Sequence, residues 1–94
     1  NLGSAYVNVR GGVMKTKNWE KEIAKFLVGK TIKNIEYLSE EEGKEMMWSQ
    51  LPLVIIFTDG SWIFPMQDDE GNDGGALATS SKKLSTIPVM WSQA

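Results

Sequence analysis

The chain has 94 residues, of which 41% are hydrophobic and 23% charged, and this composition is that of one small soluble globular domain. It contains no Cys, which excludes disulfides, thiolate metal sites and a cysteine nucleophile. It also contains no His, which excludes a Ser-His-Asp triad, the usual zinc sites and an unperturbed base that titrates near neutrality.

The formal net charge of −2 is unevenly distributed along the chain. The segment up to Lys33 carries +5, residues 34–79 carry −9, and Lys82 and Lys83 return +2. Such polarity can steer a charged partner or an ion towards the protein, and it is also typical of a solvated surface.

No apolar run is long enough to span a membrane and no signal peptide is visible, so we predict a cytoplasmic protein with no membrane contact. We expect one domain over residues 1–94. Residues 1–13 would be tag-derived or flexible because Gly3-Ser4 resembles a cloning remnant, and residues 14–94 would form the core domain. If the first residues are native, 5–9 could form a short strand.

Residues 18–28 predict an amphipathic helix. Asn18 suits the N-cap, and Gly29 suits the position after the helix, where a left-handed backbone is common. Lys21 and Lys25 would lie opposite one apolar stripe, which consists of Trp19, Ile23, Phe26 and Leu27. We expect this stripe to cover one face of a sheet.

Residues 30–38 predict a strand whose apolar residues break strict alternation, which indicates a bulge near Lys33 and Asn34. Ser39 and Glu42 then fit a capping box at the start of a second, short helix. We expect this helix to run to about Trp48, although Gly43 inside it costs on the order of 1 kcal/mol relative to Ala.

A β-hairpin is the strongest local prediction. Residues 53–57 form an apolar run rich in β-branched side chains, and Asp59-Gly60 is typical of a type I′ turn. The chain returns over 62–64. Pro52 marks the start of the hairpin and Pro65 its end, because proline cannot donate to a ladder. The first strand is apolar on both faces, which predicts a central position in the sheet.

After the hairpin, residues 67–75 predict a loop, 76–81 are ambiguous, and 84–91 predict a last strand that Pro88 places at an edge or bends. The order of elements favours an α+β domain: a small, twisted antiparallel sheet, covered by the N-terminal amphipathic helix and accompanied by a second short helix. The sheet could curl towards an SH3-like half barrel.

The predicted loop carries the first candidate site. Its oxygen-bearing side chains are those of Asp68, Asp69, Glu70, Asn72 and Asp73. Carboxylate and amide oxygens suit Ca²⁺ or Mg²⁺, with Asp68, Asp69 and Asp73 as the first ligands to consider. The spacing fits no EF-hand register, and bonding of these side chains to their own backbone in Asx turns is the favoured alternative.

The tryptophans provide a second set of candidates. Trp19 and Trp62 are predicted to lie in the core, and Trp48 and Trp91 are predicted to be partly exposed and to mark a protein contact. Lys15, Lys17, Lys21 and Lys25 could contact nucleic acid. Without interleaved aromatic residues, a solvated helix face is the favoured interpretation, so nucleic acid is not an expected partner.

Several short motifs are shared with a group of known sequences. They include Pro52-Leu53-Val54-Ile55 with Asp59-Gly60, a D-x-E-G-N-x-x-G stretch from Asp68 to Gly75, and Ile87-Pro88-Val89. In these motifs the segment from Gly29 to Val89 resembles small uncharacterised bacterial proteins with the same order of elements. The resemblance implies no known activity or ligand.

The preferred hypothesis from the sequence is a non-enzymatic module that binds a protein or associates with itself, and needs no cofactor. It depends on the Trp and Met content and on the missing catalytic residue types. One alternative is a divalent-cation site in residues 68–73. Another is a carboxylate-based hydrolase, which would need a carboxyl pKa raised by burial or by a like charge.

Overall fold

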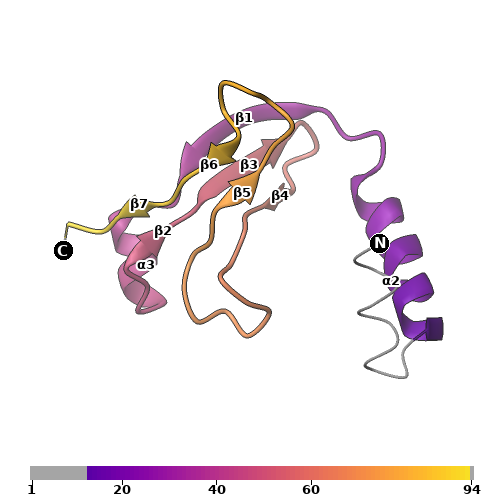
Figure 1. Cartoon of the computed structure of the whole chain (residues 1–94), viewed down its shortest axis with the longest axis horizontal. Coiled ribbons are helices and arrows are strands. Elements are labelled where there is room, and N and C mark those ends of the chain that lie inside the picture. The colour runs from indigo at the N-terminus through magenta and orange to yellow at the C-terminus, as the bar shows by residue number, and fades with distance from the viewer. Residues whose placement is uncertain (1–12, 94) are drawn as a thin grey trace. The chain divides into compact units, whose positions relative to one another are not determined.

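A computed structural model describes residues 13–93, and side chains from residue 18 onward. It divides the chain into two compact units, one up to Lys30 and one from Thr31 (Figure 1), and each is described here by itself. Helices and antiparallel strands occupy separate stretches, so the predicted α+β class is confirmed. The strand considered for residues 5–9 lies outside the described residues, and the prediction of a single domain stays a prediction.

The first unit contains helix α2, which runs from Val13 to Leu27. It begins five residues earlier than predicted, so Asn18 lies inside the helix and is not its N-cap. It ends one residue before the predicted end, and Gly29 has the predicted left-handed backbone, with φ +85°, while the Lys30 N–H bonds the Leu27 carbonyl. Within this unit Ile23 and Phe26 of the apolar stripe are exposed, Leu27 is half-buried, and Trp19, predicted to be buried, is 65% exposed. Neither described helix is long and apolar enough to cross a membrane.

The second unit is built on a three-stranded antiparallel sheet. Its strands are β1 (Ile32–Tyr37), β3 (Leu53–Phe57) and β4 (Trp62–Ile63), in the order β1-β3-β4. The predicted hairpin and the central position of its first strand are both confirmed. All three strands are visible side by side in Figure 1.

The predicted bulge in β1 is also confirmed, since the register shifts between Ile32 and Asn34. Ile32 pairs with Phe57 and Ile35 pairs with Ile55. The two partners are two residues apart, so they lie on the same face of the sheet. The bulge therefore brings both isoleucines of β1 to one face, although three positions separate them in the sequence.

The hairpin turn differs from the predicted type I′ turn. The Phe57 N–H bonds the Ser61 carbonyl, and the Gly60 N–H bonds the Phe57 carbonyl. Gly60 has φ +90°, whereas Asp59 is not among the residues with positive φ. The connection is thus a three-residue loop with glycine in the left-handed position. The Asp59 carboxylate bonds the Ser61 N–H at 2.8 Å, which stabilises this arrangement.

Helix α3 (Glu40–Glu45) begins at the predicted capping box, in which Ser39 accepts from the Glu42 N–H and Glu42 accepts from the Ser39 N–H. It ends earlier than predicted. Met47 takes φ +62°, its N–H bonds the Lys44 carbonyl, and the Trp48 N–H bonds the Gly43 carbonyl. This is a Schellman motif with methionine where glycine is usual, and it releases Trp48 from the helix.

The remaining strands form two small pairs. β2 (Gln50–Leu51) pairs with β7 (Met90–Trp91), and β5 (Leu77–Ala78) pairs with β6 (Thr86–Ile87). The predicted strand over 84–91 is therefore divided between two sheets, with Pro88 at the bend. The Tyr37 hydroxyl donates to the Pro88 carbonyl at 2.8 Å and ties this bend to β1.

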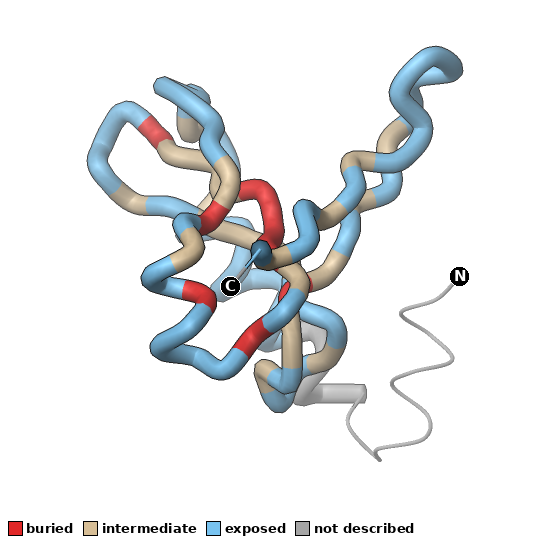
Figure 2. The backbone as a smooth tube through the Cα atoms, turned by 90° about the vertical axis from the view of Figure 1, so that its left-hand side faces the viewer, coloured by how far each residue is buried: buried red, intermediate tan, exposed pale blue. Residues whose placement is uncertain are grey.

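The core of the second unit is small. Leu38, Trp48 and Leu51 form a buried cluster, and Pro52 is fully buried beside it. Buried positions are few along the backbone (Figure 2). A side chain at Gly43 would collide with Leu51, so the glycine inside α3 allows the helix to pack against β2.

Candidate functional site

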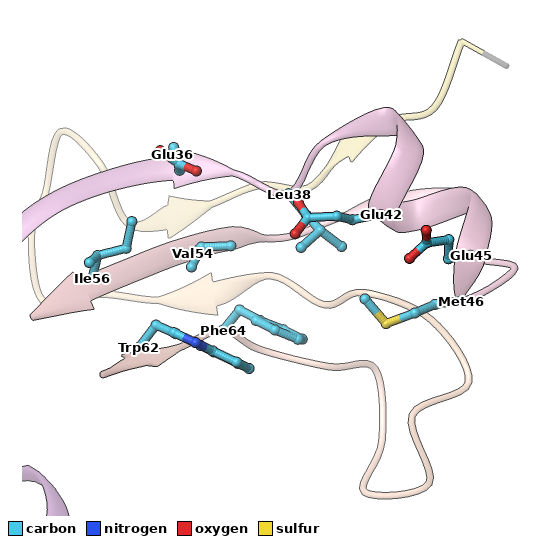
Figure 3. A pocket seen from close by; sticks show the side chains of 9 residues that line it. All are labelled: Glu36, Leu38, Glu42, Glu45, Met46, Val54, Ile56, Trp62 and Phe64. Carbon is cyan, nitrogen blue, oxygen red and sulfur yellow. The ribbon is translucent and has the colours of Figure 1, made fainter. Parts of the chain in front are cut away.

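A groove of about 490 Å³ lies between the sheet and helix α3 (Figure 3). Three groups of side chains line it. The sheet and the segment after β4 contribute an apolar floor, α3 contributes Met46 and two carboxylates, and β1 adds a third carboxylate. The lining residues are Glu36, Leu38, Glu42, Glu45, Met46, Val54, Ile56, Trp62 and Phe64.

The pairing of strands explains why these side chains share one face. Glu36 pairs with Val54, and Ile56 pairs with Trp62. Paired residues in an antiparallel sheet point to the same side, and residues two apart on a strand do too. The groove is therefore the face of the sheet opposite to the one that carries Ile35 and Ile55.

Aromatic packing fixes the far wall of the groove. The Trp62 and Phe64 rings are stacked, with centroids 5.3 Å apart and planes 5° from parallel. Phe64 also meets the buried Trp48 ring edge to face at 5.8 Å. Phe64 is thus anchored to the core, whereas Trp62 is 56% exposed. This exposure corrects the prediction that Trp62 is a core residue, because β4 is an edge strand and the groove leaves one ring face open.

Three carboxylates give the groove a negative rim. Glu36, Glu42 and Glu45 are exposed and line the groove, and Figure 3 shows Glu36 on β1 and the other two on α3. One carboxylate oxygen of Glu42 is already hydrogen-bonded, since its Oε1 accepts from the Ser39 N–H and hydroxyl in the capping box. The chemistry of the groove therefore combines an apolar floor with an acidic edge, which suits a ligand that is apolar on one face and positively charged nearby.

The acidic loop over 67–75 is folded on itself. The Gln67 N–H bonds the Asp73 carbonyl and the Gly75 N–H bonds the Pro65 carbonyl, which closes its base. Asp68 Oδ1 accepts from the backbone N–H groups of Glu70 and Asn72, and Oδ2 accepts from the Asn72 amide at 2.8 Å. These bonds are the Asx-type arrangement considered from the sequence.

Asp73 ties the loop to the segment between α3 and β2. Its Oδ1 accepts from the N–H groups of Gln50 at 2.9 Å and Gly74 at 2.8 Å, and its Oδ2 accepts from the Ser49 hydroxyl. The Trp48 indole N–H donates to the Gly71 carbonyl at 2.8 Å. The loop is thus held to the core from both sides, and the carboxylates of Asp68 and Asp73 are engaged with the chain itself.

Hydrogen bonds lower the pKa of both engaged aspartates. The Asn72 side chain, helped by backbone N–H groups, holds the pKa of Asp68 below its ordinary value of 3.8. Burial raises the pKa of Asp73, but the donors from Gln50, Gly74 and Ser49 outweigh it and bring that pKa below 3.8 as well. This direction is opposite to the raised pKa that the hydrolase hypothesis requires.

The predicted ligand residues follow one another along the acidic loop. Among the described residues, no group of three or more Asp and Glu side chains is placed to hold a metal ion. Asp68, Asp69, Glu70, Asn72 and Asp73 thus remain a predicted cation site to which the structure adds no geometric support.

Of the two tryptophans predicted to be partly exposed, one is exposed and the other is buried. Trp91 is 61% exposed, in agreement with its predicted partial exposure. Trp48 is 7% exposed, so the prediction of an exposed contact residue is wrong for it. The physical reason is the Schellman turn, which directs Trp48 into the core against Leu38 and Leu51, where its indole N–H is satisfied by Gly71.

The groove was not predicted from the sequence. One signal was available: β1 carries polar Asn34 and Glu36 on the alternation that faces Val54 and Ile56 of the central strand. On this face of the sheet the apolar side chains of the central strand β3 therefore have polar neighbours on β1, and an apolar face bordered by polar side chains is a signal of a binding site. No pattern in the sequence indicated that Glu42, Glu45 and Met46 of the α3 segment would line the same groove.

Comparisons of the chain with protein-family models, with curated proteins and with solved structures found no match. The resemblance to small bacterial proteins therefore stays a prediction.

A pH titration tests the role of the two aspartates. Because their pKa values are lower in the folded state than in the unfolded state, their contribution to stability is complete above about pH 4 and is lost as the pH falls through the folded values. We expect the parent protein to lose more stability than the Asp73→Asn variant between about pH 5 and about pH 2. Urea denaturation at each pH measures this, and equal losses would contradict the assignment.

Proposed function

We propose that this chain is a small protein-binding module whose groove receives one face of an amphipathic, positively charged helix. The observation that carries the proposal is the groove itself, with Val54, Ile56, Trp62 and Phe64 beneath three carboxylates. Helix recognition commonly uses such a hollow, in which apolar side chains at i, i+4 and i+7 provide the anchors.

Two features support binding over catalysis. The chain has no His and no Cys, the side chains that most often perform acid-base and nucleophilic chemistry near neutral pH. The groove offers an exposed aromatic ring, Trp62, on a wall anchored by Phe64, and aromatic residues in this setting are typical of binding hot spots.

A model peptide tests the proposal on the whole chain. The probe is a synthetic amphipathic helix with leucine at i, i+3, i+4 and i+7 and lysine elsewhere. We expect it to bind and to shift the NMR signals of the Trp62 indole and the Val54 and Ile56 methyl groups. The double variant Glu36→Lys, Glu45→Lys should weaken binding about tenfold, since it replaces two attractions by repulsions worth about 1.4 kcal/mol in total.

The matched control is the double variant Asp69→Lys, Glu70→Lys. It changes the net charge equally but alters exposed positions of the acidic loop that do not line the groove. Binding by the control should stay close to that of the parent. The proposal fails if the peptide leaves the groove signals unchanged, or if a peptide with glutamate in place of lysine binds equally well.

Two finer predictions of the fold stay predictions: a sheet covered by the N-terminal amphipathic helix, and a sheet that curls towards an SH3-like half barrel. The peptide titration also bears on the first, because a helix of the same chain on the groove would compete with the probe and lower its apparent affinity.

A further inference from the structure

We infer that the partner of the groove is helix α2 of a second copy of this chain, so that two chains associate by placing each helix in the groove of the other. This inference rests on the proposed function of the groove. It names the occupant and predicts a closed, two-fold symmetric dimer.

The apolar stripe of α2 has the spacing of the anchors by which amphipathic helices bind grooves. Trp19, Ile23 and Phe26 occupy positions i, i+4 and i+7, and they are 65%, 48% and 44% exposed. Two aromatic residues and one branched aliphatic residue on one stripe provide large anchors for a hollow lined by Val54 and Trp62.

The charges of the two units are opposite. Residues 1–30 contain six basic and two acidic side chains, whereas residues 31–94 contain four basic and ten acidic side chains. One positive charge lies on the stripe itself, since the Lys30 ammonium sits 3.8 Å from the centre of the Phe26 ring. A helix entering the groove would thus bring cations to Glu36, Glu42 and Glu45, and this complementarity favours encounter and orientation.

The short connection between α2 and β1 favours exchange between copies. Only residues 28–31 join the two elements, with Gly29 in a left-handed conformation and Lys30 folded back onto Phe26. Short hinges of this kind are the usual setting for exchange of an identical element between protomers. A dimer formed by exchange contains two helix-groove contacts.

A mixed-label experiment distinguishes a second copy from every other occupant. Because the chain has no Cys, Lys21→Cys gives one site for a spin label, on the side of α2 opposite the stripe. Spin-labelled chain is mixed with ¹⁵N-labelled chain of natural sequence. We expect broadening of the Trp62 indole signal in the ¹⁵N-labelled copy, and a dimer mass in light scattering.

The variant Ile23→Glu should raise the dimer dissociation constant at least about tenfold and abolish the broadening, because it places a charge in the stripe. Lys21→Gln lowers the net charge by the same one unit on the opposite side of the helix and should leave the dimer intact. Absence of broadening in the mixed sample overturns the inference. Broadening that occurs only when both labels are in one molecule also overturns it, in favour of the chain's own helix.

The inference and the proposed function can fail separately. If the chain stays monomeric while the synthetic lysine-leucine peptide shifts the groove signals, the groove is a helix-binding site whose partner is another protein. If the peptide has no effect and the chain is monomeric, both are wrong.

Discussion

Trp48→Ala is expected to lower the free energy of unfolding by about 4 kcal/mol, a large part of the stability of a domain this size. Trp48 is 7% exposed, fills the core beside Leu38 and Leu51, and meets Phe64 edge to face. Its removal also leaves the Gly71 carbonyl without the indole donor. Urea denaturation followed by far-UV circular dichroism measures the loss.

Trp91→Ala is the matched control for this measurement. Trp91 is 61% exposed and lies on the two-residue strand β7, so the same change of side chain should cost about 1 kcal/mol or less. Equal losses for the two variants would show that Trp48 does not anchor the core. The Trp48 variant should also weaken binding of the groove probe, because Phe64 would lose its buried partner.

Gly74→Ala is expected to cost about 3 kcal/mol, although it adds a single methyl group. A Cβ at this position would collide with the Gln50 carbonyl oxygen and lie 2.6 Å from Cδ of Pro52. The carbonyl is fixed backbone and Pro52 is fully buried, so neither can move aside cheaply. The Asp73 carboxylate, which bonds the N–H groups of Gln50 and Gly74, would be displaced with them.

Gly60→Ala is the comparison variant, because it strains the backbone without crowding any neighbouring atom. Nothing lies within 4 Å of a Cβ at Gly60, but its φ of +90° strains any other residue, so the cost should be about 1 to 2 kcal/mol. A loss at Gly74 no larger than at Gly60 would mean that the acidic loop is not packed against β2. The same denaturation experiment reports both.

The local elements were predictable because each depends on residues close in sequence. The capping box needs only Ser39 and Glu42, and the end of α2 needs only Gly29. The hairpin follows from an apolar run, a glycine turn and a return strand, and even the bulge in β1 was visible as broken alternation. The type of turn was wrong because Asp-Gly also fits a three-residue loop, and pairing of Phe57 with Ser61 selects it.

The role of the acidic loop could not be predicted from its local sequence. Its composition equally fits a cation site and a self-bonded connection, and the difference lies in distant partners. Asp73 bonds Gln50, and Gly71 accepts from Trp48, each across 23 positions of the chain. The lowered pKa of Asp73 follows in part from such distant donors, Gln50 and Ser49, whereas the pKa of Asp68 is lowered by donors within four residues.

The sequence by itself determined the α+β class, the capped helix α3, the end of α2 and the hairpin, because short-range hydrogen bonding and backbone preference decide them. Only the tertiary structure decided that Trp48 is buried and Trp62 exposed, and that α3 and the sheet enclose an acidic, apolar groove. These features depend on which elements pack together, and packing depends on contacts between residues far apart in the chain.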